Sequence, residues 1–243
     1  MRSFGMTDIG KKRNVNQDYL FYSDDPVGCF PNLYIVADGM GGHKAGDKAS
    51  SYAVKRFVEL AGREKEDSPF LVMERLLEEV NEEVYQMSCE EEQYAGMGTT
   101  FVAATVVEKT AYIMNVGDSR LYYYNGKISQ ITMDHSLVEE LVRAGELNRR
   151  ESRNHPQKNI ITKALGVAGN VEPDFFMVPM EKKSKILLCS DGLTNMVEDE
   201  KLEEILSGEK TEKEMAQKCV EEALFYGGLD NIAVVIAQEG NGR

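Results

Sequence analysis

The sequence has few of the residues that build zinc sites and disulfides. Its 243 residues include three histidines, so a histidine-rich zinc site is not expected. The four cysteines are far apart and form no C-x-x-C pair, which indicates reduced thiols rather than a disulfide framework. These residues are His43, His135 and His155, and Cys29, Cys89, Cys189 and Cys219.

Positive charge and long apolar runs are also scarce. The chain has 28 basic and 41 acidic residues and a formal net charge of -13, and such a surface repels nucleic acid. The N-terminus has no apolar signal-peptide core, and the apolar run at 232–237 is too short to cross a bilayer. We therefore expect a cytoplasmic protein without nucleic-acid or membrane partners. If it acts on phosphoesters, it needs metal ions or a few well-placed arginines.

The apolar patterns predict several strands joined by short links. The Asn125-Gly126 pair predicts a hairpin with a type I′ turn, and residues 108–110 predict a second hairpin turn. Strands joined by such short links must be antiparallel. We expect strands over 19–23, 33–37, 99–107, 111–116, 120–124, 127–131, 185–189 and 232–237.

Helical patterns stand between blocks of strands, in the order strands, two helices, a run of antiparallel strands, then strands and helices again, which is not a regular βαβ alternation. Apolar residues recur at helical intervals over 45–61, and Ser68 with Pro69 predicts the cap and first turn of the next helix. Thr211 and Glu214 form a capping-box pattern, and a further helix is expected over 137–147. The order indicates an α+β fold of antiparallel sheets covered by helices.

No interdomain linker interrupts the pattern. We expect one domain over 1–238 and a C-terminal tail over 239–243. The polar stretch at 144–159 is the least regular part of the sequence and is expected to be an exposed excursion.

Aspartates recur where apolar strands begin or end. Asp38 and Asp191 each follow a strand and precede glycine, Asp118 ends a third strand, and Asp230 opens a fourth. A single Asp-Gly after a strand is usually only a turn. If the four strand ends converge, however, the carboxylates repel one another unless a cation lies between them. Hard divalent cations such as Mg²⁺ or Mn²⁺ suit a sparse ring of carboxylates.

Two neighbouring features fit such a centre. The glycine-rich stretch at 38–43 matches neither G-x-x-x-x-G-K-[ST] nor G-x-G-x-x-G, so it is better explained by backbone carbonyls that approach a metal closely. Arg13 precedes a strand, and its planar guanidinium group could bind a phosphoryl group through paired N–H donors. Taken alone, the Lys11-Lys12-Arg13 cluster is more often a solvated loop.

Together these motifs resemble the metal-dependent protein phosphatases of type 2C, the PPM family, in their compact bacterial form. The matching blocks follow the family order through nearly the whole chain. They are R-x-x-N-Q-D at 13–18, D-G-M-G-G-H at 38–43, G-T-T at 98–100, N-V-G-D-S-R at 115–120, D-H-S at 134–136, T-K-A-L-G at 162–166, S-D-G-L at 190–193 and D-N at 230–231.

The resemblance implies a four-layer α-β-β-α sandwich with a metal centre at one end. It implies two Mn²⁺ or Mg²⁺ ions and a possible third. Asp38 would bridge two ions and the Gly39 carbonyl would bind the first, while Asp191 and Asp230 would hold the second. Asp118, together with Asp191, matches the position of the third ion in bacterial members.

The resemblance also implies the catalytic roles. Asp18 would act through metal-bound water, Arg13 would hold the substrate phosphate, and Arg13 and Asp38 are the predicted catalytic residues. Two cations activate a water that attacks phosphorus directly, so no nucleophilic serine or cysteine is needed. The excursion at 144–159 falls where the family carries a flap beside the site.

The sequence departs from the family pattern at two positions. Met40 stands where some relatives have a histidine that protonates the leaving group, and a thioether cannot donate a proton. His43 is one candidate for that role, although packing against the loop is the favoured interpretation. Lys163 stands where many relatives have arginine, which changes little unless that arginine makes a bidentate contact.

The predicted function is hydrolysis of phosphoserine and phosphothreonine on proteins. The phosphorylated proteins would be its substrates, a serine/threonine kinase the enzyme that it opposes, and the chain a monomer. A phosphatase of small phosphate esters is one alternative. A non-catalytic module that binds phosphoproteins is another, but it predicts lost metal ligands, and the four strand-end aspartates are present.

Overall fold

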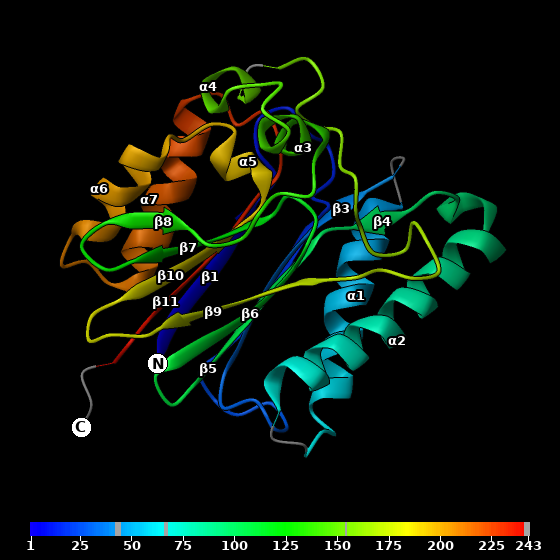
Figure 1. Cartoon of the computed structure of the whole chain (residues 1–243), viewed down its shortest axis with the longest axis horizontal. Helices are drawn as coiled ribbons and strands as arrows, with labels where there is room; N and C mark the ends of the chain where they lie inside the picture. Colours follow the sequence, from blue (N-terminus) through cyan, green and yellow to red (C-terminus); the bar gives the residue numbers. More distant parts are fainter. Residues whose placement is uncertain (42–44, 66–67, 154, 241–243) are drawn as a thin grey trace.

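The computed structural model describes residues 1–41, 45–65, 68–153 and 155–240. Two antiparallel sheets pack face to face, and helices cover both outer faces (Figure 1). The predicted four-layer α-β-β-α sandwich is therefore confirmed.

The two sheets have different strand orders. The first sheet has the order β1 (Arg2–Asp8), β11 (Ile232–Gln238), β10 (Lys185–Cys189), β7 (Arg120–Tyr124) and β8 (Ile128–Gln130). The second has the order β2 (Asp18–Ser23), β3 (Leu33–Met40), β5 (Phe101–Val107), β6 (Thr110–Val116) and β9 (Asp174–Pro179), and β4 (Gly98–Thr99) pairs with β3. Every strand pairing is antiparallel.

Alternation along the central strands separates the layers. In β3, Tyr34 and Val36 pack between the two sheets, whereas Leu33, Ile35 and Ala37 pack against the helices. Successive side chains of a strand point to opposite faces, so a strand buried on both faces is apolar throughout. By the same period of two, Asp38 falls on the face between the sheets, at the end of the layer.

Long helices close the two outer layers. In Figure 1, α1 (Gly46–Ala61) and α2 (Pro69–Glu90) lie outside the second sheet, and α6 (Asp199–Ser207) and α7 (Glu212–Phe225) lie outside the first. Shorter elements fill the remaining connections. They are the 3-10 turn η1 (Glu92–Tyr94), α3 (Leu137–Arg143), α4 (Arg149–Ser152) and α5 (Asp191–Thr194). None of the helices in the described ranges combines the length and apolar composition needed to cross a bilayer.

The predicted helix caps and helix ends have different outcomes in the structure. Thr211 and Glu214 form the predicted capping box at the start of α7. Ser68 occupies the N-cap position of α2, but its side chain makes no capping hydrogen bond, so that part of the prediction is wrong. The helix predicted over 137–147 ends at Arg143.

The hairpin between β7 and β8 is present, although its turn differs from the prediction. Gly126 has a φ of +80°, whereas Asn125 is not among the residues with positive φ. A type I′ turn requires positive φ at both central residues, so this turn is not of that type. The hairpin predicted at 108–110 is also present, between β5 and β6, and Glu108 in its turn has a φ of 53°.

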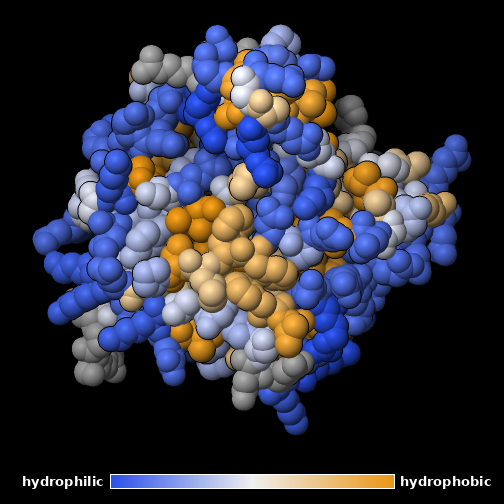
Figure 2. All heavy atoms as spheres, in the orientation of Figure 1, coloured by the Kyte–Doolittle hydropathy of each residue, from blue (hydrophilic) through white to orange (hydrophobic). Residues whose placement is uncertain are grey.

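Two edge strands were not predicted. β1 contains polar residues and Gly5, where an added Cβ would lie 2.7 Å from the ring of Tyr22. β9 ends in Pro179 and leaves Met177 60% exposed. Figure 2 shows apolar side chains over the part of this face that β9 crosses in Figure 1. An edge strand pairs with a neighbouring strand on one side only and is more exposed, so the apolar pattern of its sequence is weaker.

The buried side chain of Asn32 should contribute measurably to stability. It accepts a hydrogen bond from the Val106 N–H and donates one to the Val106 carbonyl, both 2.8 Å long. Asn32→Ala leaves both backbone groups unpaired, so the free energy of unfolding should fall by about 1–3 kcal/mol in urea titrations. Asn170→Ala, at an exposed position, is the control. Equal stability of the two variants would contradict the role given to Asn32.

Candidate active site

The strand ends converge at one end of the sandwich. Asp18 and Asp38 are directly opposed partners in the β2–β3 ladder. Asp191 follows β10 and Asp230 precedes β11, and these two strands are also neighbours. Asp18, Asp191, Asp118 and Asp230 all raise the pKa of Asp38 by charge repulsion, in addition to the larger effect of burial. The structure therefore brings together all five predicted aspartates.

Threonine side chains fix the backbone of Asp38. The Asp38 N–H donates to Thr100 Oγ1 at 2.9 Å, and Thr99 Oγ1 donates to the Asp38 carbonyl at 3.0 Å. Thr100 Oγ1 also lies 2.7 Å from Ser119 Oγ. These bonds explain why the G-T-T block belongs to the motif set, since they hold the central carboxylate in place.

Gly39 is required by a close backbone approach. A Cβ at this position would lie 2.0 Å from the Gly46 carbonyl oxygen and 2.8 Å from that of Gln17. The start of α1 and the loop before β2 can therefore approach β3 only because residue 39 has no side chain.

Asp18 is held by Ser190. Ser190 Oγ donates to Asp18 Oδ2 at 2.6 Å and accepts from the Ala233 N–H at 2.9 Å. This serine thus connects the two sheets. Burial, opposed by the bond from Ser190, raises the pKa of Asp18 to about 8.

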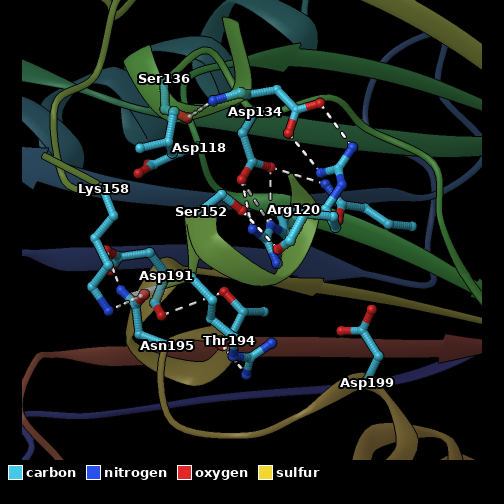
Figure 3. Close-up of a pocket in the computed structure, with 15 residues that line it drawn as sticks. Asp118, Arg120, Asp134, Ser136, Ser152, Lys158, Asp191, Thr194, Asn195 and Asp199 are labelled. Atoms are coloured by element: carbon cyan, nitrogen blue, oxygen red, sulfur yellow. Dashed lines mark hydrogen bonds and ion pairs between the residues drawn. The ribbon is translucent and has the colours of Figure 1, made fainter. Parts of the chain in front are cut away.

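Asn195 holds Asp191 in the same way. Asn195 Nδ2 donates to Asp191 Oδ2 at 2.8 Å, while Lys158 Nζ lies 3.2 Å from Asn195 Oδ1. Figure 3 shows these three side chains in sequence beside a pocket of about 150 Å³ that Asp118 also lines. Burial is the first cause that raises the pKa of both Asp118 and Asp191.

Arg13 lies at the exposed side of the cluster. One of its terminal nitrogens is 2.7 Å from Asp230 Oδ2, and this bond is the first cause that raises the pKa of Arg13. The predicted phosphate-binding residue and a predicted metal ligand therefore form an ion pair. Asn231 fixes the loop at 9–17 that carries Arg13. Its side chain accepts a hydrogen bond from the Gln17 N–H and donates to the carbonyls of Ile9 and Val15.

The donor set fits divalent cations. Asp18, Asp118 and Asp191 each have one buried carboxylate oxygen, Oδ1, without a hydrogen-bond partner. A buried charged oxygen without a partner is costly, and oxygen-rich sites are what Mg²⁺ and Mn²⁺ select. Among the described residues, no three His, Cys, Asp or Glu side chains already form a closed ligand set around one point. Such cations commonly complete a sparse protein shell with water.

The segment predicted as a flap lies over this pocket. Arg153 donates to the carbonyls of Thr194 and Val197 at 3.0 and 3.1 Å, on the α5 side of the pocket. Arg149 makes a bidentate ion pair with the buried Glu139 of α3. The segment is therefore attached to both sides of the pocket that Asp118 and Asp191 share.

The two departures from the family pattern, Met40 and Lys163, and the candidate proton donor His43 have different outcomes. His43 lies outside the described residues. Met40 ends β3, and a thioether remains unable to donate a proton. Lys163 Nζ donates to the Glu172 carbonyl at 2.7 Å and lies 3.5 Å from Asp174 Oδ1, which are contacts with the segment leading into β9.

Some supporting residues were not assigned a role from sequence. Thr100, Ser190 and Asn231 stood inside the recognised blocks, but a motif does not reveal which atoms bond. Asn195 stands four residues after Asp191, a spacing that places two side chains on one helix face, and this signal could have identified it.

Comparisons with known proteins agree with this geometry. A family model described as protein phosphatase 2C matches residues 10–222. A serine/threonine phosphatase Stp of Listeria monocytogenes serotype 4b is 44% identical, in an alignment that covers 96% of this chain and 93% of that protein. The chain belongs to the protein phosphatase 2C family.

Solved structures extend the similarity to the fold. The serine/threonine phosphatase Stp1 from Staphylococcus aureus aligns with a TM-score of 0.91 and 35% identity, over 98% of this chain and 95% of that chain. The catalytic domain of the phosphatase PstP, solved in complex with two manganese ions, aligns with a TM-score of 0.86 and 31% identity, over 98% and 97%. Metal dependence is thus supported at the level of the family.

Asn195 should influence metal affinity although it is not a proposed ligand. Asn195→Ala removes the bond that orients Asp191, so calorimetric titration should give a Kd for Mn²⁺ about tenfold weaker. Asn170→Ala, remote from the cluster in sequence and exposed, should leave the Kd unchanged. An unchanged Kd in Asn195→Ala would show that Asp191 needs no such support.

Proposed function

We propose that this protein serine/threonine phosphatase uses its buried aspartate cluster to hold two divalent cations, Mn²⁺ or Mg²⁺, with a possible third. The activity itself follows from its family and its relatives. The observation that carries the proposed centre is the group of unpartnered carboxylate oxygens on Asp18, Asp118 and Asp191.

The proposed metal ligands have distinct roles. Asp38 is close enough to the other four carboxylates for each of them to raise its pKa, and it would be shared by two ions, with the Gly39 carbonyl on the first. Asp191 and Asp230 would hold the second ion, and Asp118 with Asp191 the third. Asp18 would contribute through a water molecule. The cations of such a centre supply water activation and neutralise the charge of the phosphoryl group.

Arg13 is the proposed phosphate-binding residue. Its side chain is half exposed and bonds Asp230 through one terminal nitrogen. A guanidinium has five N–H donors, so donors remain for phosphoryl oxygens. These donors orient the phosphate and stabilise charge as it spreads in the transition state. Asp230 in turn fixes the guanidinium beside the cluster.

The complete set of aspartates argues against a non-catalytic binding module. Protein rather than small-ester substrates are favoured by the named relatives.

The cellular setting is also part of the proposal. We infer that residues 1–238 act as one catalytic domain, as a monomer, in the cytoplasm, where the four cysteines stay reduced as thiols. Dephosphorylation of signalling proteins there requires an opposing serine/threonine kinase, which we propose as the functional partner.

Removal of one proposed ligand should abolish turnover. Asp191→Ala should lower kcat/KM for a phosphothreonine peptide in Mn²⁺ by more than about 100-fold. Loss of a residue that only orients a metal ligand typically costs about 10–100-fold, and the loss of a ligand itself should cost more. EDTA should abolish the activity of the unmutated chain. Asp25→Ala, which removes an exposed carboxylate, is the control. Activity that survives both EDTA and Asp191→Ala would overturn the metal mechanism.

The kinase proposal predicts a change in cells. Deletion of this protein should raise phosphosite occupancy on the opposing kinase and on its substrates, because their dephosphorylation is lost. Quantitative phosphopeptide analysis measures this occupancy. Reintroduction of the unmutated chain should reverse the rise, whereas Asp191→Ala should not. Unchanged occupancy after deletion would reject the partnership.

A further inference from the structure

We propose that an exposed surface beside Arg13 binds the polypeptide on one side of the phosphorylated residue and selects acidic and apolar side chains there. This inference rests on the proposed function. The surface, here called the rim, comes from the loop after β1 and the end of α7 with the loop that follows. Its residues are Ile9, Lys11, Lys12, Phe225, Tyr226 and Leu229.

The apolar part of the rim is unusually accessible. Phe225 is 77% exposed, the highest value among the large apolar side chains described, and Tyr226 and Leu229 are 56% and 53% exposed. The rings of Phe225 and Tyr226 meet edge to face, with centroids 5.2 Å apart. Contiguous exposed apolar groups with aromatic members are typical of binding surfaces.

Backbone bonds hold the two segments of the rim together. The Lys11 N–H donates to the Gly228 carbonyl at 2.7 Å, and Asn231 Nδ2 donates to the Ile9 carbonyl at 2.9 Å. A Cβ on Gly10 would lie 2.2 Å from the Asp230 carbonyl oxygen. In Figure 1 the blue loop after β1 and the red-orange loop after α7 meet at the same end of the sandwich. The rim is therefore a preformed surface.

The rim is continuous with the phosphate-binding group. Arg13 directly follows Lys12 in one segment, and Asp230 directly follows Leu229 in the other; the two side chains form an ion pair. An extended peptide advances about 3.3 Å per residue. A substrate whose phosphate contacts Arg13, and whose chain runs from there toward Lys12 and Leu229, would place its next few residues on the rim.

The charge of the rim predicts the chemistry of its occupant. Lys11 and Lys12 are exposed and form no ion pair within the described part of the chain. They stand on a protein with a net charge of -13, which otherwise repels acidic peptides. An acidic residue next to the phosphoresidue would meet these lysines, and an apolar residue farther along would pack on Phe225 and Leu229.

The test compares substrates and variants in Mn²⁺. One phosphothreonine peptide carries aspartate and leucine beside the phosphoresidue, and a matched peptide carries alanine at both positions. Para-nitrophenyl phosphate, which has no polypeptide, reports on the metal centre in every variant. The rim variants are Phe225→Ser with Leu229→Ser, and Lys11→Ser with Lys12→Ser. Met177→Ser and Lys127→Ser, which replace exposed residues elsewhere, are the matched controls.

We expect the unmutated chain to prefer the aspartate–leucine peptide about tenfold in kcat/KM, chiefly through KM. In each rim variant this preference should fall severalfold, whereas the controls should retain it. Fluorescence anisotropy of the same peptides with the EDTA-treated chain measures binding without turnover and should give the same order.

Other outcomes contradict the proposal. Equal kcat/KM for both peptides, or a preference that survives in the rim variants, would overturn it. A rim variant that changes the sedimentation coefficient but not peptide preference would assign the surface to contact with a second copy. Failure of the unmutated chain to hydrolyse even para-nitrophenyl phosphate would instead reject the proposed function, and anisotropy would still test the rim.

Discussion

Carboxylates of like charge are buried against one another where the strands of the two sheets end. Asp38 has four other aspartates close enough to raise its pKa, and burial raises it further. Such an arrangement opposes folding unless the charges are protonated, bonded or balanced by cations. Ser190 and Asn195 bond one oxygen each on Asp18 and Asp191 and leave the other oxygen free. The site is therefore organised for an external positive charge.

The surrounding strands and loops hold the carboxylates in this buried cluster. Antiparallel pairing sets Asp18 directly opposite Asp38, and the central strands are anchored by apolar layers on both faces. The absence of a side chain at Gly39 lets α1 and the 9–17 loop close over the strand end. Asn231 then ties that loop to β11 through three hydrogen bonds. Arg13 is thereby positioned beside the cluster without being buried in it.

Patterns that come from burial were predictable from sequence, whereas features set by individual contacts were not. The strand that ends at Asp38 is apolar on both faces, and its place in the core was correctly predicted. β1 and β9 are edge strands with mixed patterns and were missed. The convergence of the aspartates required the fold or a family resemblance, because spacing along the chain does not fix which strand ends meet. Likewise, no sequence pattern states that Arg13 bonds Asp230 or that Phe225 remains exposed.

The buried aspartate cluster is proposed to bind divalent cations. Anomalous diffraction above the manganese absorption edge, from crystals of the unmutated chain grown with Mn²⁺, locates such ions. We expect two strong anomalous peaks that share Asp38 as a ligand, with a third peak between Asp118 and Asp191 at higher Mn²⁺ concentration. Peaks only elsewhere on the protein, or no peak at the cluster at saturating Mn²⁺, would show that the cluster is not the cation site.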